Sequence, residues 1–272
     1  MREGRLALVT GGTSGIGLAY ADRLASMGYH LIITGRRMEV LNARAEEIRH
    51  RHRVSVSTLE AELTRDRDLE ELERVLTRER PSFLVNNAGF GIRSYFVDTP
   101  RKTWEALVKV HVMAPLRLTQ GALKYMLEGS GGTIVNVSSE AAFLPVMRNS
   151  VYSGAKAFLL RWTESVALEV MGTPIRIQAL CPGMTRSDFH PRMGQEGASL
   201  SGSPLIRWIT PQEVVDESIR ALQSGKVICV PKASGKMRTT LMPLIPQRAR
   251  HRCLRWFFRA SSRGGNSCNS EN

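Results

Sequence analysis

The sequence predicts an α/β fold in which helices cover both faces of a parallel sheet. Segments with strand and helix signals alternate along the chain, as they do when parallel strands are joined by helical crossovers. The length of 272 residues and the hydrophobic content of 42% suit a single globular domain with one core. No internal repeat interrupts the alternation.

The expected elements follow from short apolar runs and from longer segments with apolar residues at helical spacing. Strands are expected at residues 6–10, 31–34, 54–59, 83–86, 133–138, 175–181 and 227–230. Helices are expected at residues 15–27, 38–51, 66–79, 101–127, 151–171 and 211–223. In the first helix, Leu18, Leu24 and Ala25 fit this spacing, and Gly28 suits its C-terminal cap. The run His50-Arg51-His52-Arg53 is expected to be a solvated loop.

A glycine-rich turn joins the first strand to the first helix. It reads Thr10-Gly11-Gly12-Thr13-Ser14-Gly15-Ile16-Gly17. Gly11 allows a tight turn, Gly15 lets the backbone approach a pyrophosphate, and Gly17 lets the helix pack close to the strand. The helix N-terminus attracts phosphates. The turn therefore indicates a dinucleotide site. A purely structural glycine turn is the alternative, which the flanking strand and helix disfavour.

Two arginines follow the second strand, in the segment Gly35-Arg36-Arg37. An NAD-specific site usually has an acidic residue here that binds the ribose 2′-hydroxyl. A guanidinium suits a 2′-phosphate through its charge and its planar set of donors. The sequence therefore favours NADP(H) over NAD(H). The alternative is that Arg36 and Arg37 are ordinary water-facing residues at a helix N-terminus, although arginine there opposes the helix dipole.

Tyr152 and Lys156 lie four residues apart and would project from one face of the helix expected at 151–171. The ammonium would favour the phenolate and lower the pKa of the tyrosine from about 10 toward neutral. Ser139, at the end of a strand, offers a hydroxyl to the oxygen that gains or loses the proton. With a hydride donor, these side chains would interconvert a carbonyl and an alcohol.

These motifs resemble those of the short-chain dehydrogenase/reductase family, in the branch with a Thr-Gly-x-x-x-Gly-x-Gly turn. Three further segments match the family: Asn86-Asn87-Ala88-Gly89, Ser138-Ser139 and Cys181-Pro182-Gly183-Met184-Thr185. The resemblance covers most of residues 5–231. It implies a Rossmann-type, doubly wound sheet of seven parallel strands in the order 3-2-1-4-5-6-7.

The resemblance also implies a role for each catalytic residue. Tyr152 would be the general acid in reduction and the general base in oxidation. Lys156 would lower its pKa and hydrogen-bond the nicotinamide ribose, and Ser139 would orient and polarise the carbonyl oxygen. The cofactor NADP(H) would contact Gly11, Thr13, Ser14, Gly15, Ile16, Gly17, Arg36, Arg37, Glu62, Leu63, Asn87, Ala88, Gly89, Tyr152, Lys156, Pro182, Gly183 and Thr185.

Two residues depart from the family pattern. His111 occupies the point where the family usually has an asparagine that helps to hold a water in the proton relay behind the lysine. Histidine could hold a water or shuttle a proton there, or it could be a half-buried helix residue in an altered relay. Glu62 stands where the family usually has an aspartate near the adenine, so a matching role for it is open.

The expected substrate is an apolar ketone or a ketoacyl- or ketosteroid-like molecule, and the expected activity is NADPH-dependent reduction. Apolar residues from three variable segments could form its cavity, or could simply belong to the core. They are Phe90, Tyr95, Phe96, Phe143, Leu144, Met147, Phe189, Met193 and Trp208. Residues 185–210 are expected to form a lid. The competing function is an NADP-binding sensor or scaffold that has lost turnover.

The net charge of +13 is concentrated at the C-terminus, where residues 232–272 contain nine basic residues and one acid, Glu271. Residues 1–235 are expected to be the NADP-binding domain, 236–260 a basic amphipathic extension and 261–272 a disordered tail. Arginines beside Trp256 and Phe257 suit an anionic membrane surface. A solvated basic helix packed on the domain and nonspecific nucleic-acid contact are the alternatives, and no specific nucleic-acid partner is expected.

The expected location is the cytoplasm, with peripheral contact at the inner membrane surface as an option. The first strand begins close to Met1, leaving no room for a signal peptide, and no apolar run reaches the roughly 18–20 residues of a membrane-spanning helix. The four cysteines are scattered, so neither a metal centre nor a redox pair is predicted. The resemblance implies a homodimer or homotetramer that pairs through the helices at 101–127 and 151–171.

Overall fold

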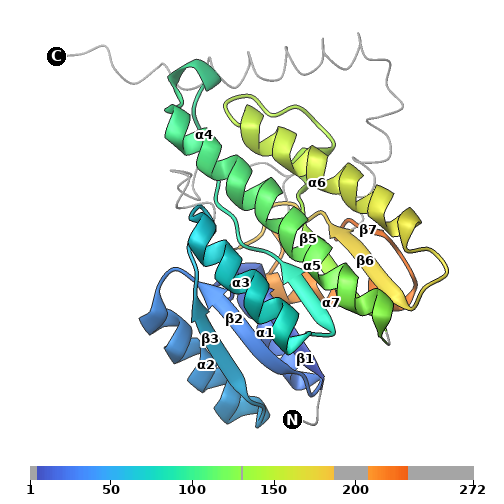
Figure 1. The fold of residues 1–272 in the computed structure, drawn as a ribbon. Helices are drawn as coiled ribbons and strands as arrows, with labels where there is room; N and C mark the ends of the chain where they lie inside the picture. Colours follow the sequence, from blue (N-terminus) through green and yellow to red (C-terminus); the bar gives the residue numbers. More distant parts are fainter. Residues whose placement is uncertain (1–4, 130, 187–207, 232–272) are drawn as a thin grey trace.

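The computed structural model describes residues 5–129, 131–186 and 208–231. Within them, seven parallel strands form one sheet in the order β3-β2-β1-β4-β5-β6-β7 (Figure 1). The strands are β1 (Leu6–Thr10), β2 (His30–Gly35), β3 (Val56–Glu60), β4 (Phe83–Asn86), β5 (Gly132–Val137), β6 (Ile175–Leu180) and β7 (Ile228–Cys229). The predicted α/β class, parallel pairing and strand order are confirmed.

Helices cover both faces of this sheet, as Figure 1 shows. They are α1 (Gly15–Ser26), α2 (Met38–His52), α3 (Asp66–Glu79), α4 (Arg101–Val108), α5 (Ala114–Glu128), α6 (Ser150–Glu169) and α7 (Pro211–Gln223). In β1, Ala7 and Val9 pack with α1, α2 and α7, whereas Leu8 packs with α3, α5 and α6. Successive residues of a strand point to opposite faces, so each strand contributes to two hydrophobic layers.

The helix expected at 101–127 is interrupted, which corrects the prediction. A π-helical turn, η2 (Lys109–Met113), separates α4 from α5. Pro115 lies in the first turn of α5 and has no N–H to give to the carbonyl of His111, four residues earlier. The N–H of Ala114 instead bonds to the carbonyl of Lys109, five residues earlier. The extra residue per turn is characteristic of a π-bulge, and such bulges are frequent at functional sites.

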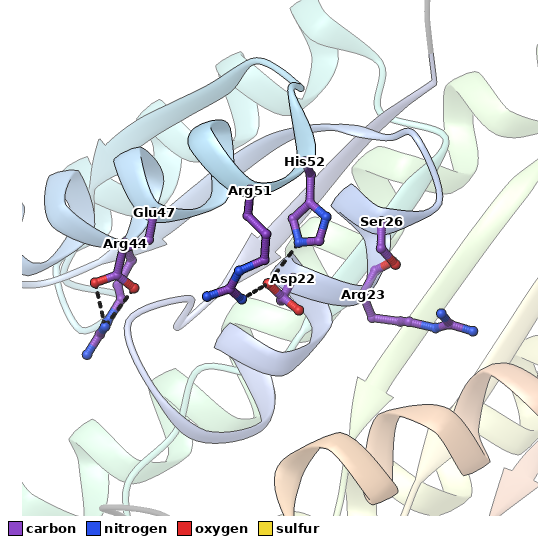
Figure 2. A network of polar contacts seen from close by, with 7 residues as sticks. All are labelled: Asp22, Arg23, Ser26, Arg44, Glu47, Arg51 and His52. Atoms are coloured by element: carbon purple, nitrogen blue, oxygen red, sulfur yellow. Dashed lines mark hydrogen bonds and ion pairs between the residues drawn. The ribbon is translucent and has the colours of Figure 1, made fainter.

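The solvated loop expected at residues 50–53 is also corrected, because α2 continues through His52. Arg53 then ends the helix in a left-handed conformation, with φ of 56°. Arg51 and His52 both contact the carboxylate of Asp22 on α1, at 2.6 and 2.9 Å (Figure 2). The run therefore connects α2 to α1 at the protein surface.

The carboxyl ends of β1, β4, β5 and β6 meet at one edge of the sheet, which is where open α/β sheets bind ligands. The 3₁₀ turn η3 (Glu140–Ala142) follows β5 at this edge, and a second 3₁₀ turn, η1 (Phe96–Asp98), precedes α4. No helix in the described residues is long and apolar enough to cross a membrane. The predicted extension at 236–260, the tail at 261–272 and most of the predicted lid lie outside the described residues.

Candidate active site

A cavity of about 750 Å³ opens at this edge of the sheet. It collects most of the predicted site residues from segments far apart in the sequence. Those that line it are Gly11, Thr13, Ser14, Gly15, Ile16, Arg36, Arg37, Glu62, Leu63, Asn87, Ala88, Gly89, His111, Ser139, Tyr152, Lys156, Pro182, Gly183 and Thr185. Gly17 is absent from the lining.

Gly17 instead allows the close packing expected of it. A Cβ atom at Gly17 would lie 2.2 Å from the carbonyl oxygen of Gly11 and 2.4 Å from Nδ2 of Asn87. Asn87 in turn donates hydrogen bonds from Nδ2 to the carbonyls of Thr10 and Gly11, at 3.0 and 3.1 Å. The segment after β4 thus holds the glycine turn in place.

The N-terminus of α1 faces the cavity and has the features of an anion site. Ser14 is its N-cap residue but makes no side-chain capping bond, and the first turn contains no acidic residue. The first N–H groups of a helix have no partner within the helix, and the helix dipole is positive there. This end of the cavity therefore fits the pyrophosphate of a dinucleotide.

Arg36 and Arg37 lie at the same end of the cavity and are both exposed. Nη1 of Arg36 is 3.4 Å from Oε2 of Glu62, which follows β3. The pair places a guanidinium and a carboxylate side by side beyond the carboxyl ends of β2 and β3. Two guanidinium groups and one carboxylate therefore lie close together at this part of the cavity lining.

Tyr152 and Lys156 lie on α6 and line the cavity, and both are buried. Nζ of Lys156 donates a hydrogen bond of 2.6 Å to the carbonyl of Val137 and lies 5.6 Å from the centroid of the Tyr152 ring. Ser139 follows β5, and its Oγ accepts a hydrogen bond from the N–H of Ala141 at 3.1 Å. The strand and the helix thus bring the three predicted side chains together.

The predicted lowering of the tyrosine pKa is wrong for this structure. Burial raises the pKa of Tyr152 to about 12, and a hydrogen bond with Ser139 opposes the rise only in part. Burial also lowers the pKa of Lys156 to about 7, which weakens the cation that was expected to act on the phenol. Desolvation disfavours the charged form of each group. Tyr152 is therefore a protonated phenol at neutral pH.

His111 reaches the cavity from the π-helical turn and is only 2% exposed. Its Nε2 lies 2.7 Å from the carbonyl oxygen of Phe90, a contact that needs a proton on Nε2, and 3.1 Å from the N–H of the same residue, a contact that needs a lone pair there. Burial, and secondly the charge of Lys156, hold the pKa of His111 well below its usual range. The imidazole is therefore neutral. Its Nδ1 is buried and has no hydrogen-bond partner within the described residues.

Gly89 makes room for the His111 ring. A Cβ atom at position 89 would lie 2.5 Å from Cε1 of His111. The glycine at position 89 is thus physically linked to the histidine at position 111, which stands where the family usually has an asparagine. On its other side, the imidazole lies edge-on against the ring of Tyr152.

The substrate walls match the expectation only in part. Phe90, Phe143 and Leu144 line the cavity. Tyr95, Phe96 and Met147 do not, and their exposed fractions of 49%, 60% and 42% place them on the surface. Trp208 is described but is not at the cavity, and Phe189 and Met193 lie outside the described residues.

Sequence reasoning missed Asn149, which also lines the cavity. It precedes Tyr152 by three residues, a spacing that places two side chains on neighbouring positions of a helix surface. That spacing was the available signal.

Comparisons with known proteins show the family to which the chain belongs. The family model for short chain dehydrogenases matches residues 5–197. The 3-oxoacyl-[acyl-carrier-protein] reductase FabG of Aquifex aeolicus is 33% identical over 220 residues, which cover 79% of this chain and 88% of that protein. Sulfoacetaldehyde reductase 2 of Chromohalobacter salexigens is 33% identical over 219 residues, covering 78% and 84% of the two chains.

Solved structures show the same fold. A short-chain dehydrogenase from Sphingobium yanoikuyae in complex with NADPH superposes with a TM-score of 0.79 at 28% identity, covering 98% of this chain and 96% of that one. The bulky-bulky ketone specific alcohol dehydrogenase of Comamonas testosteroni has a TM-score of 0.75 at 28% identity, covering 89% and 95%. The chain belongs to the short-chain dehydrogenase/reductase family and is an oxidoreductase that acts on CH–OH and C=O groups.

Proposed function

We propose that the protein is an NADPH-dependent reductase of an apolar ketone. The observation that carries this proposal is the continuity of the cavity, which runs from Arg36 and Arg37, past the N-terminus of α1, to Ser139, Tyr152 and Phe143. One cavity thus contains cations, a site for phosphate, a proton donor and an apolar wall. Related proteins whose names include a ketoacyl substrate or a bulky ketone support the choice of substrate.

The cofactor, when bound, would supply a hydride to the carbonyl carbon. Ser139 would donate a hydrogen bond from Oγ to the carbonyl oxygen and so stabilise the negative charge that develops there. Tyr152 would give its phenolic proton to the same oxygen, which completes the alcohol. A phenol with a pKa of about 12 carries the proton at neutral pH, which suits reduction.

Lys156 would stabilise the phenolate that proton transfer leaves behind. Its ammonium lies over the Tyr152 ring and is fixed by the carbonyl of Val137. A new negative charge beside it raises the affinity of the amine for a proton. Proton loss from Tyr152 and proton uptake by Lys156 would therefore favour each other.

His111 would take part in the return of the proton from solvent. Its neutral ring packs against Tyr152 and has a buried, unpaired nitrogen, Nδ1, which would give a water held there a polar partner. This is the function that an asparagine usually has at this position in the family.

The pairing of copies of the chain through α4, α5 and α6 stays a prediction.

The experiment is a spectrophotometric assay of NADPH consumption with apolar aryl ketones and a 3-oxoacyl thioester. Turnover of at least one of them, with a stronger dependence on NADPH than on NADH, supports the proposal. Tight NADPH binding without turnover of any carbonyl compound would favour the sensor function instead.

A further inference from the structure

Four large apolar side chains lie exposed beside the cavity and form what we call the rim patch. They are Tyr95, Phe96, Val97 and Met147, of which Val97 is 89% exposed. The two segments that carry them also contribute to the cavity, because Gly91 and Val146 are among its lining residues. These segments lie side by side, since the N–H of Ser94 donates a hydrogen bond to the carbonyl of Arg148 at 2.9 Å. The rim patch therefore borders the cavity.

A hydrogen-bonded turn presents the most exposed part of the rim patch. Phe96 and Val97 lie in the 3₁₀ turn η1. The carbonyl of Tyr95 accepts hydrogen bonds from the N–H of Asp98 at 3.1 Å and from Oγ1 of Thr99 at 2.9 Å. The turn thus holds its apolar side chains at the surface. Contiguous exposed apolar residues of this kind mark a surface that binds a partner.

Basic residues surround the rim patch. Residues 91–105 and 141–151 contain two acids, Asp98 and Glu105, and four exposed basic residues, Arg93, Arg101, Lys102 and Arg148. Within the described residues, only Arg101 of these four makes an ion pair, with Glu105 at 2.7 Å. Arg101 and Lys102 open α4, whose first turn contains no acid. Cations at a helix N-terminus oppose the helix dipole, so an anion outside the protein would be favourable here.

This combination of side chains fits the surface of an anionic lipid bilayer. Aromatic and aliphatic side chains enter the boundary between headgroups and acyl chains, while Lys and Arg attract anionic lipids. A second copy of the chain fits less well, because symmetric pairing through the rim patch would bring the same cations toward one another.

The position of the C-terminal segment supports the same partner. The described chain ends at Pro231, beyond the carboxyl end of β7 and so at the edge of the sheet where the cavity opens. Residues 232–272 continue from there and contain nine basic residues and one acid, together with Trp256 and Phe257. Two regions that combine cations with aromatic residues therefore start at one edge of the molecule.

We propose that the rim patch docks the protein on an anionic lipid bilayer, with the opening of the cavity toward the lipid. An apolar ligand then passes from the bilayer to the cavity without crossing bulk water. This inference goes beyond the proposed reductase, because binding to a bilayer requires no turnover.

The test is cosedimentation of the full-length protein with vesicles of phosphatidylcholine alone, or of phosphatidylcholine mixed with phosphatidylserine. Phe96→Ser combined with Val97→Ser removes two apolar side chains of the patch. Leu168→Ser combined with Met171→Ser is the matched control, because these side chains are also exposed but lie at and beyond the C-terminal end of α6, away from the residues of α6 that line the cavity. A third variant, Arg93→Gln combined with Lys102→Gln, removes two of the cations.

The wild-type protein and the control are expected to bind the anionic vesicles about tenfold more tightly than the neutral ones. The Phe96→Ser/Val97→Ser protein should bind the anionic vesicles about tenfold more weakly than the wild type. The Arg93→Gln/Lys102→Gln protein should lose affinity for the anionic vesicles only. Each of these results supports the proposal.

Failure of the wild-type protein to bind anionic vesicles, or unchanged binding by the Phe96→Ser/Val97→Ser protein, overturns the proposal. Light scattering without vesicles tests the other occupant of the patch. A smaller assembly of the Phe96→Ser/Val97→Ser protein than of the wild type and the control would assign the rim patch to a second copy of the chain, which likewise overturns the proposal.

Discussion

The imidazole of His111 lies edge-on against the phenol ring of Tyr152, with the ring centroids 5.3 Å apart and the ring planes at 86°. Two features of the chain create this contact. The π-helical turn carries His111 to the cavity, and Gly89 leaves space for the ring. The histidine is thus in direct contact with the residue that would donate the proton.

His111→Phe should lower turnover by about tenfold or more, because it keeps an aromatic ring beside Tyr152 but removes both ring nitrogens. The NADPH affinity should be unchanged, and the pH profile of kcat should shift. His111→Asn should retain more activity than His111→Phe, because an amide can still hold a water. Steady-state rates across the pH range would check this, and full activity of His111→Phe would refute a proton-transfer role.

Gly89→Ala should destabilise the protein by about 1–3 kcal/mol, since its Cβ would overlap the His111 ring. Replacing His111 with alanine removes the overlapping atoms, so Gly89→Ala should cost much less in a His111→Ala background. Urea unfolding of the two single variants and the double variant measures this coupling. Strictly additive losses would show that the two residues do not constrain each other.

Arg36→Ala together with Arg37→Ala should weaken NADPH binding by about tenfold or more while changing NADH binding little, because only NADPH carries the 2′-phosphate. Arg44→Ala is the matched control, since Arg44 lies on α2, the helix that follows the two arginines, but pairs with Glu47 and is not at the cavity (Figure 2). Fluorescence titrations of both nucleotides provide the affinities. Equal losses for NADPH and NADH would argue against recognition of the 2′-phosphate.

The stability of the nucleotide-free protein should depend on pH through Lys156. Its pKa falls from 10.5 in the unfolded chain to about 7 in the folded protein. Between these values the unfolded chain binds more protons, so this residue makes stability rise with pH from about 7 toward 10.5. Lys156→Met should therefore raise the Tm more at about pH 6 than at about pH 9. A difference in Tm that is the same at both pH values would contradict burial of the amine.

The family resemblance implied the sheet order, and the meeting of the glycine turn, Ser139 and Tyr152 has a topological reason. The carboxyl ends of neighbouring parallel strands share one edge, so motifs that follow those strands must converge there. The interruption at Lys109–Met113 was missed, although Pro115 was its signal, because a proline in the first turn of a helix is usually harmless.

Other properties depend on burial, which spacing does not reveal. The i, i+4 relation of Tyr152 and Lys156 suggested a lowered tyrosine pKa, but both side chains are desolvated and the phenol shifts the opposite way. The aromatic character of Tyr95 and Phe96 likewise suggested a cavity wall, yet both are exposed, and Tyr95 stacks with the guanidinium of Arg148 at 5.1 Å.

The rate of NADPH-dependent ketone reduction by Tyr152→Phe tests the central claim most directly, because this change removes only the phenolic oxygen. The account predicts that kcat falls by at least about 100-fold while the affinity for NADPH stays that of the wild-type protein. A Tyr152→Phe protein that reduces the ketone at a rate close to that of the wild type would contradict the assignment of Tyr152 as the proton donor.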